Sequence, residues 1–234
     1  MSTKSALAIL DPAVISAPAE ELRERFDQYG YVRFPGLLTG SGLPTVRAEL
    51  ERLEGVARRR DFAMECTGGS SRHMTAAGGR LIEARSEFIP RLYADDRIAE
   101  LLRRASGLDV TRVPDPVERH VANYLHERGD THGAHFDDYP FALVIFAEAP
   151  RSARDGGLLE YAPHARGLDD LGTARALRAH HRPGDAYLLR SDTTAHRVTP
   201  LRRAGLRRVV LNFAYTAPGI RTATTPSAEL LYGE

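Results

Sequence analysis

The sequence predicts an α+β fold whose core is a double-stranded β-helix, the jelly roll found in cupin-like proteins, with N-terminal helices packed on one face. Apolar residues recur at helical spacing in the first half of the chain, whereas short β-type segments separated by Gly, Pro and Asp fill residues 116–217. Helices followed by antiparallel-looking strands are typical of this class. A chain of 234 residues, 42% hydrophobic and 27% charged, is long enough to bury such a core without a disulfide.

Local patterns indicate a single domain over residues 1–234. Residues 1–115 are expected to be mainly helical with a loop, residues 116–217 to form the jelly roll, and residues 218–234 to form a C-terminal tail. The elements expected in the first part are a helix from about 16 that ends at Gly30, a strand over 31–34, helices over about 41–58 and 96–105, and a structured loop over 61–80. The strands expected in the core cover 117–125, 141–148, 158–161, 185–189 and 208–216.

Composition excludes several classes of protein. The formal net charge of +1 argues against dedicated binding to nucleic acid or to a membrane surface, and no apolar run is long enough for a membrane span or a signal peptide core. Cys66 is the only cysteine, so an internal disulfide and a cysteine-based zinc site are excluded. We therefore expect a cytoplasmic protein that binds a small molecule, and a homodimer is compatible with the sequence.

Two segments of the predicted core carry residues with metal-ligand chemistry. His135 and Asp137 are spaced i,i+2, which on an extended strand directs both side chains to one face, and this spacing favours Asp137 over its neighbour Asp138. His196 lies in a turn after a later strand. Two histidines and one carboxylate on a small β-barrel form the facial triad typical of a non-haem Fe(II) centre, with three positions left open.

A buried arginine is expected on the last predicted strand, where it could pair with the distal carboxylate of a keto acid. Alternation along residues 208–216 puts the bulky apolar side chains on one face, which should lie under the helices, and puts Arg208 and Asn212 on the other. We therefore assign the anchor to Arg208 and expect Arg207 to be a surface charge.

In these motifs the chain resembles the Fe(II)/2-oxoglutarate-dependent oxygenases. The motifs are His135-x-Asp137, His196, Arg208, the stretch Gly156–Tyr161 and the stretch Arg182–Leu188. More narrowly, the chain resembles the small bacterial enzymes that act on free amino acids, the lysine radical halogenases and their hydroxylase relatives. The resemblance extends from the Arg72 loop to Tyr215, and the combination of motifs is specific where each motif alone is not.

The resemblance implies the cofactors and the residues that bind them. Fe(II) would be held by the two histidines and Asp137, with 2-oxoglutarate and O₂ as co-substrates. Arg208 would anchor the C5 carboxylate of 2-oxoglutarate, and Tyr124 would add a hydrogen bond to it. A tyrosine buried in the core is the competing interpretation of Tyr124.

The resemblance also implies a substrate shell for an amino acid. Arg72 and Asn212 would hold the α-carboxylate, His132 and Asp138 would lie near the α-amino group, and Glu118 would take the side-chain ammonium of lysine. A buried carboxylate needs a cationic partner, which supports this assignment. The competing interpretations are an ion pair between Glu118 and an arginine, a surface arginine at Arg72 and a structural histidine at His132.

Asp137 decides which reaction is expected. In the halogenases that this chain resembles, a small residue replaces the triad carboxylate and leaves a position for chloride. Since this sequence keeps Asp137, the resemblance implies hydroxylation, with L-lysine as the expected substrate. Three alternatives stay open: arginine, ornithine or a carrier-bound amino acid as the substrate, a cupin-like protein that binds a ligand without turnover, and a zinc hydrolase.

Overall fold

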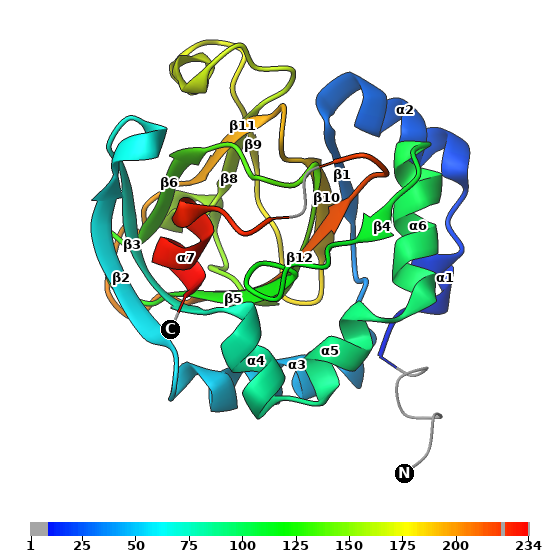
Figure 1. The fold of residues 1–234 in the computed structure, drawn as a ribbon, viewed down its shortest axis with the longest axis horizontal. Helices are drawn as coiled ribbons and strands as arrows, with labels where there is room; N and C mark the ends of the chain where they lie inside the picture. The colour runs from blue at the N-terminus through cyan, green and yellow to red at the C-terminus, as the bar shows by residue number, and fades with distance from the viewer. Residues whose placement is uncertain (1–8, 221–222, 234) are drawn as a thin grey trace.

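The computed structural model describes residues 9–220 and 223–233 of the chain (Figure 1). Its α-helices are α1 (Pro12–Ile15), α2 (Ala19–Tyr29), α3 (Gly42–Glu54), α4 (Gly79–Arg85), α5 (Phe88–Tyr93), α6 (Asp96–Ser106) and α7 (Pro226–Tyr232). Its strands are β1 (Tyr31–Phe34), β2 (Arg58–Met64), β3 (Ser70–Ala77), β4 (Thr111–Arg112), β5 (His120–Leu125), β6 (Thr131–His135), β7 (Phe141–Glu148), β8 (Leu159–Ala162), β9 (Leu177–Ala179), β10 (Ala186–Arg190), β11 (Ala195–Val198) and β12 (Arg208–Thr216). Short 3₁₀ turns lie at Glu65–Thr67, Ala153–Asp155 and Leu168–Gly172.

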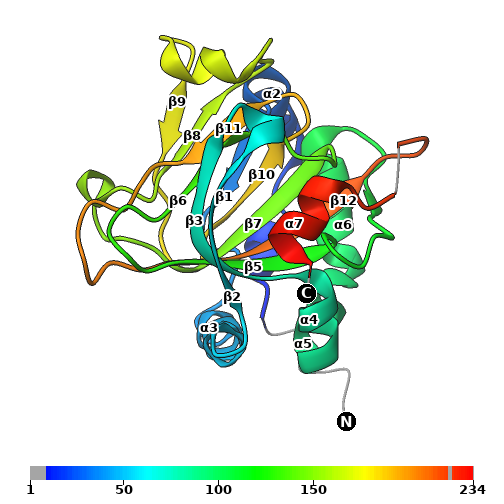
Figure 2. The ribbon, with the colours of Figure 1, turned by 60° about the vertical axis from the view of Figure 1, so that its left-hand side comes forward.

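All strand pairs are antiparallel and follow one continuous path in the order β1-β10-β7-β12-β5-β3-β6-β11-β8-β9, with β2 beside β3 and β4 beside β12. The sheet curls strongly, so that β6, β11 and β8 face β7 and β12 across the interior (Figure 2). This arrangement is the expected jelly roll.

The helices cover the outer face of the half of the sheet that contains β12 and β7 (Figure 1). Alternation along β12 is the physical reason, and it agrees with the sequence prediction. Val209, Leu211, Phe213 and Tyr215 are buried in one apolar core with the inner faces of α2, α3, α5 and α6. The residues between them point into the interior of the curled sheet.

Helix ends follow the expected chemistry at two positions. Gly30 and Gly107 end α2 and α6 in the left-handed conformation, with φ of 59° and 69°, which glycine adopts without the steric penalty of a side chain. The Asp95 side chain accepts a hydrogen bond from the Arg97 amide and begins α6. The helix expected over 41–58 ends at Glu54 instead, because the chain enters β2 at Arg58.

The loop expected over residues 61–80 is wrong. This segment forms most of the β2–β3 hairpin, and β3 then pairs with both β5 and β6. Local Gly, Ser and Thr content favours a loop, but sheet pairing satisfies the backbone of these residues and buries Met74 and Ala76. The hairpin therefore forms one wall of the site.

The C-terminal segment folds back onto the curled sheet. Helix α7 lies against β3, between the β2–β3 hairpin and β12 (Figures 1 and 2). Thr225 begins α7 by accepting a hydrogen bond from the Ala228 amide at 3.1 Å. In the described part of the chain, no helix is long and apolar enough to cross a membrane.

Candidate metal and substrate site

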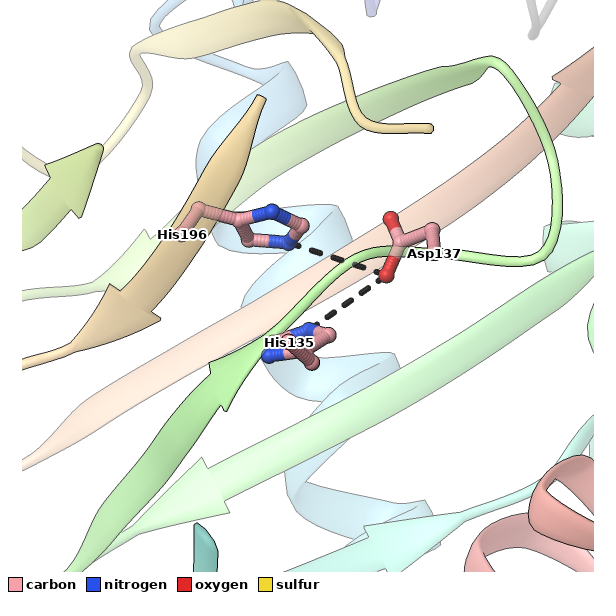
Figure 3. Close-up of side chains that lie close together, drawn as sticks. All are labelled: His135, Asp137 and His196. Atoms are coloured by element: carbon pink, nitrogen blue, oxygen red, sulfur yellow. Dashed lines mark ion pairs between the residues drawn. The ribbon is translucent and has the colours of Figure 1, made fainter. Parts of the chain in front are cut away.

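Three side chains with metal-ligand chemistry meet inside the curled sheet (Figure 3). His135 ends β6, Asp137 follows two residues later, and His196 lies on β11 directly opposite His135 in the strand pairing. The Asp137 Oδ1 atom lies 3.3 Å from His135 Nε2 and 3.6 Å from His196 Nε2. One ligand atom from each residue lies within 4.8 Å of the other two, so a single ion can contact all three.

Backbone carbonyls fix the direction of both imidazole rings. The Nδ1 atom of His135 lies 2.7 Å from the Gly133 carbonyl, and that of His196 lies 2.9 Å from the Thr194 carbonyl. A hydrogen bond at Nδ1 leaves Nε2 without a proton and directed toward Asp137, which is the orientation that metal-binding histidines adopt. The donor set therefore fits a divalent first-row metal such as Fe(II) with open coordination positions.

The electrostatic environment keeps these groups in the states that bind metal. Burial lowers the pKa of His196 to about 4, and repulsion from His135 adds to the shift, so the imidazole is neutral at pH 7. Burial alone would raise the pKa of Asp137, but its interactions with His196, His135 and Ser191 outweigh burial and lower that pKa. A neutral histidine and an ionised carboxylate are the forms that coordinate metal.

Arg208 lies deep in the interior behind the three ligands. Its side chain is 2% exposed, lines the same inner cavity as His135, Asp137 and His196, and has no carboxylate partner among the described residues. The guanidinium lies over the Phe146 ring at 5.0 Å and beside the phenol of Tyr187, and burial lowers its pKa. Arg207, by contrast, forms ion pairs with Glu54 and Glu148 on the outer face.

A larger cavity of about 430 Å³ opens beside the ligands, and all five expected substrate residues line it. Arg72 is fully buried there, and its only bonds are to Ser70 and the Ser71 carbonyl, so its charge has no acidic partner among the described residues. The Nε2 atom of His132 and the Oδ1 atom of Asn212 are also buried without a partner. His132 stacks on the His135 ring at 4.2 Å.

Glu118 brings an unpaired carboxylate to this same cavity. Its Oε2 atom is buried without a hydrogen-bond partner, and no arginine among the described residues pairs with it. Burial raises the pKa of Glu118 to about 9, and the nearby carboxylates of Asp138, Asp137 and Asp115 contribute. The structure thus does not show the ion pair that was the competing interpretation of Glu118.

Asp138 lies at the edge of the cavity, where it holds α7. Its carboxylate accepts hydrogen bonds from Thr225 Oγ1 at 2.6 Å and Ser227 Oγ at 3.5 Å. The side chain is exposed and is not part of the ligand cluster, which contains Asp137 alone of the two neighbouring aspartates.

Tyr124 is a correction to the sequence analysis. Its hydroxyl donates a hydrogen bond to the Leu50 carbonyl of α3 at 2.8 Å, and its ring is buried in the core under the helices. Tyr124 follows Asn123 on β5, and adjacent residues on a strand face opposite sides. Asn123 lines the inner cavity, so Tyr124 points away from it.

Sequence reasoning missed the tyrosines that do line the site, Tyr139, Tyr187 and Tyr232. Alternation along β10 could have found Tyr187, because it shares the inner face with Leu189. Tyr232 comes from α7, together with Ser227, Ala228 and Leu231. No local signal in the tail indicates that it returns to the cavity.

Comparison with known proteins places this geometry in context. The family model for Halogenase D matches residues 15–228. Searching the curated proteins gives no significant match.

Several solved structures share the fold at low sequence identity. The 2-oxoglutarate-dependent epimerase SnoN from nogalamycin biosynthesis superimposes with a TM-score of 0.69 at 18% identity, over 94% of this chain and 90% of its own. HygX from Streptomyces hygroscopicus, with nickel and 2-oxoglutarate bound, gives 0.65 at 17% identity, over 89% and 93%. A Pseudomonas putida prolyl-4-hydroxylase gives 0.59 at 16% identity, over 86% and 100%. The fold is therefore that of the 2-oxoglutarate-dependent oxygenases.

Proposed function

Because the chain belongs to the Halogenase D family, we propose that it is an Fe(II)- and 2-oxoglutarate-dependent hydroxylase of a free amino acid, with L-lysine as the first candidate. The observation that carries this proposal is one cavity whose wall contains His135 and Asp137 together with an unpaired cation, Arg72, and an unpaired carboxylate, Glu118. Iron with 2-oxoglutarate and O₂ would supply the oxidising chemistry. The residues of this chain would hold the metal, the co-substrate and the amino acid in place.

The co-substrate is assigned to the inner cavity. His135, Asp137 and His196 would hold the metal, and Arg208 lies behind them without a carboxylate partner among the described residues. A dicarboxylate whose far end pairs with Arg208 would satisfy this buried charge through the bidentate geometry that guanidinium groups favour. The position of Tyr187 beside Arg208 supports the same assignment and replaces Tyr124.

The amino acid is assigned to the larger cavity. Arg72 and Asn212 can offer N–H donors to its α-carboxylate, and the buried Nε atom of Arg72, which has no hydrogen-bond partner, favours an anionic ligand. Burial lowers the pKa of His132 well below its usual value, so its neutral ring can accept a hydrogen bond from the α-ammonium, with Asp138 nearby. Glu118 is left for a cation at the far end of the substrate.

Hydroxylation rather than halogenation is proposed because of Asp137. Its carboxylate lies within reach of the same ion as the two histidines, so it would fill the position that a halide needs. The metal would then have no vacant place for chloride beside the co-substrate and O₂. This chain is therefore proposed to be a hydroxylase within a family named for halogenases.

The substrate class follows from charge and volume. A cavity of about 430 Å³ whose lining includes both Arg72 and Glu118 suits a small zwitterion with a cationic side chain. Ornithine and arginine share this chemistry with lysine, and a carrier-bound amino acid would lack the free α-carboxylate that Arg72 is proposed to hold. A cytoplasmic location and a homodimer stay predictions from the sequence.

The test uses protein loaded anaerobically with Fe(II) and then given 2-oxoglutarate, O₂, chloride and a panel of free amino acids. Succinate release that depends on lysine, with one oxygen atom added to lysine, is the expected result. If succinate release depended on another amino acid instead, the metal and co-substrate assignments would stand and the lysine assignment would be wrong. Absence of substrate-dependent succinate with every free amino acid would contradict the proposed function.

A further inference from the structure

A second cavity, of about 330 Å³, lies behind the substrate cavity, between β2, α4 and the end of α7. Tyr232 forms part of the wall of both cavities. Three arginines line the second cavity, Arg58, Arg60 and Arg85, while Leu81 and Ala84 contribute to an apolar wall.

No acidic group among the described residues balances the positive charge of this cavity. None of the residues that line it is acidic, and within residues 9–220 and 223–233 no carboxylate forms an ion pair with any of the three arginines. Neighbouring arginines behave differently: Arg59 pairs with Asp130 at 2.7 Å and Arg80 pairs with Glu229 at 3.0 Å. Arg59 and Arg80 are thus neutralised, whereas Arg58 and Arg85, which are exposed, and Arg60, which is partly buried, have no acidic partner among the described residues.

The strand geometry of β2 brings two of these charges together. Arg58 and Arg60 are two residues apart, so they project from the same face of the strand at roughly 7 Å spacing. Arg60 donates a hydrogen bond to the Gly233 carbonyl at 2.7 Å, but its Nε atom is buried without a partner. Burial and repulsion from Arg58 lower the pKa of Arg60, as expected where no anion balances the pair.

We propose that this cavity binds a small oxyanion, a carboxylate or a phosphate, through Arg58, Arg60 and Arg85. Planar guanidinium groups recognise such anions through paired N–H donors, and the apolar wall accommodates a short hydrocarbon body. Because Arg60 also holds the Gly233 carbonyl and Tyr232 separates the two cavities, the bound anion stabilises the end of α7. This site is separate from Arg208 and does not depend on the proposed reaction.

The test titrates the metal-free full-length protein with inorganic phosphate and, separately, with succinate, by calorimetry at constant ionic strength maintained with sodium chloride. Saturable binding with a Kd of about 1 mM or lower is expected, and Arg85→Gln and Arg60→Gln should each weaken it about tenfold or more. Arg25→Gln, which removes an exposed charge on α2, an element that contributes no residue to this cavity, is the matched control and should leave the Kd unchanged. Hydrogen exchange of the α7 amides should slow when the anion is bound.

One further variant shows which cavity holds the succinate. Arg208→Gln separates succinate held at the inner cavity from succinate held here, so succinate binding that persists in Arg208→Gln and is lost in Arg85→Gln identifies a carboxylate site. Binding of phosphate alone identifies a phosphate site. Arg85 makes no side-chain bond to α7, so its variant keeps the test valid if Arg60→Gln misfolds. Failure of both anions to bind saturably, or a Kd unaffected by Arg85→Gln, would overturn the proposal.

Discussion

Three ionisable side chains are assigned to ligand binding because they lack a partner of opposite charge among the described residues, and not because of their residue type alone. Arg72, Arg208 and Glu118 are ionisable groups inside or beside cavities, and no described residue of opposite charge pairs with them. Burying a charge without a partner is unfavourable enough that proteins keep such groups mainly where a ligand completes them. Replacing these residues one at a time should therefore affect the co-substrate and the amino acid separately.

Arg208→Gln should raise the KM for 2-oxoglutarate about tenfold or more, because the buried guanidinium is the only cation that lines the inner cavity in the described part of the chain. The KM for lysine should change little. Steady-state succinate release measures both constants. Arg207→Gln is the matched control, since Arg207 is paired on the outer face with Glu54 and Glu148. Equal effects of the two substitutions would contradict the anchor assignment.

Lysine binding should release a proton near pH 7. The pKa of Glu118 is raised by burial to about 9, so the carboxyl is largely protonated in the free protein, and an incoming ammonium favours its ionised form. Calorimetry of lysine binding in buffers of different ionisation enthalpy measures the number of protons released, which should approach one.

Glu118→Gln should abolish this proton release and raise the KM for lysine about tenfold or more, while the KM for 2-oxoglutarate is retained. Glu127→Gln, at an exposed position outside the cavity, is the control. A proton release that survives Glu118→Gln would show that another group takes the ammonium.

At the level of secondary structure, α7 and the β2–β3 hairpin supply walls of the substrate cavity beside the curled sheet. Ser227, Ala228, Leu231 and Tyr232 of α7 line the substrate cavity. The start of the helix is tied to Asp138, the residue that follows the metal ligand Asp137. A change in how stably α7 packs against the cavity should therefore affect amino-acid binding more than co-substrate binding.

Thr225→Ala tests this coupling. The substitution removes the N-cap of α7 and its bond to Asp138, and losing such a cap costs about 1 kcal/mol of helix stability. Hydrogen exchange of the α7 amides should accelerate about fivefold, and the KM for lysine should rise while that for 2-oxoglutarate is unchanged. Thr45→Ala on α3, whose hydroxyl bonds only within its own helix, should change neither. If Thr225→Ala left the hydrogen exchange of the α7 amides unchanged, the proposed stabilisation of α7 by this cap would be wrong.

At the scale of the whole molecule, two buried histidines outside the metal site make the fold sensitive to acid. Burial lowers the pKa of His120 to about 4 and that of His181 to about 3, with repulsion from Arg119 and Arg208 respectively adding to it. Both rings are neutral in the folded protein, while in the unfolded chain they titrate near 6.5. Stability should thus fall as the pH falls below about 6.5.

The expected loss is up to roughly 3 kcal/mol from each histidine between pH 6.5 and 4, because the unfolded state binds protons that the folded state does not. Urea unfolding of the metal-free protein at several pH values measures it. His181→Gln should reduce the loss on acidification even if it lowers stability at pH 7, whereas the exposed His164→Gln should not. An unfolding free energy independent of pH from 7 to 5 would contradict the neutral burial of these rings.

The sequence correctly predicts those features of the fold that follow from the alternation of apolar and polar residues or from the conformational preferences of turn residues. The ranges 141–148 and 208–216 are correct to the residue, Gly30 and Gly107 end their helices, and the Arg208 face of β12 points inward. The same alternation rule, applied to β5, would have put Tyr124 in the core with Ala122. The failure at 61–80 has another cause, since β3 is positioned by pairing with β5 and β6 over long sequence separations, which leaves no local pattern. The position of α7 likewise depends on packing against β3, which is far away in the sequence.

The central claim is that Asp137 directs this member of the Halogenase D family toward hydroxylation of an amino acid with a cationic side chain. The most direct test is mass spectrometry of the product from Fe(II)-loaded protein given L-lysine, 2-oxoglutarate and O₂ with chloride in excess. One added oxygen atom on lysine and no chlorinated product is the predicted result. Chlorinated lysine, or unmodified lysine with no succinate formed beyond that without substrate, would contradict the account.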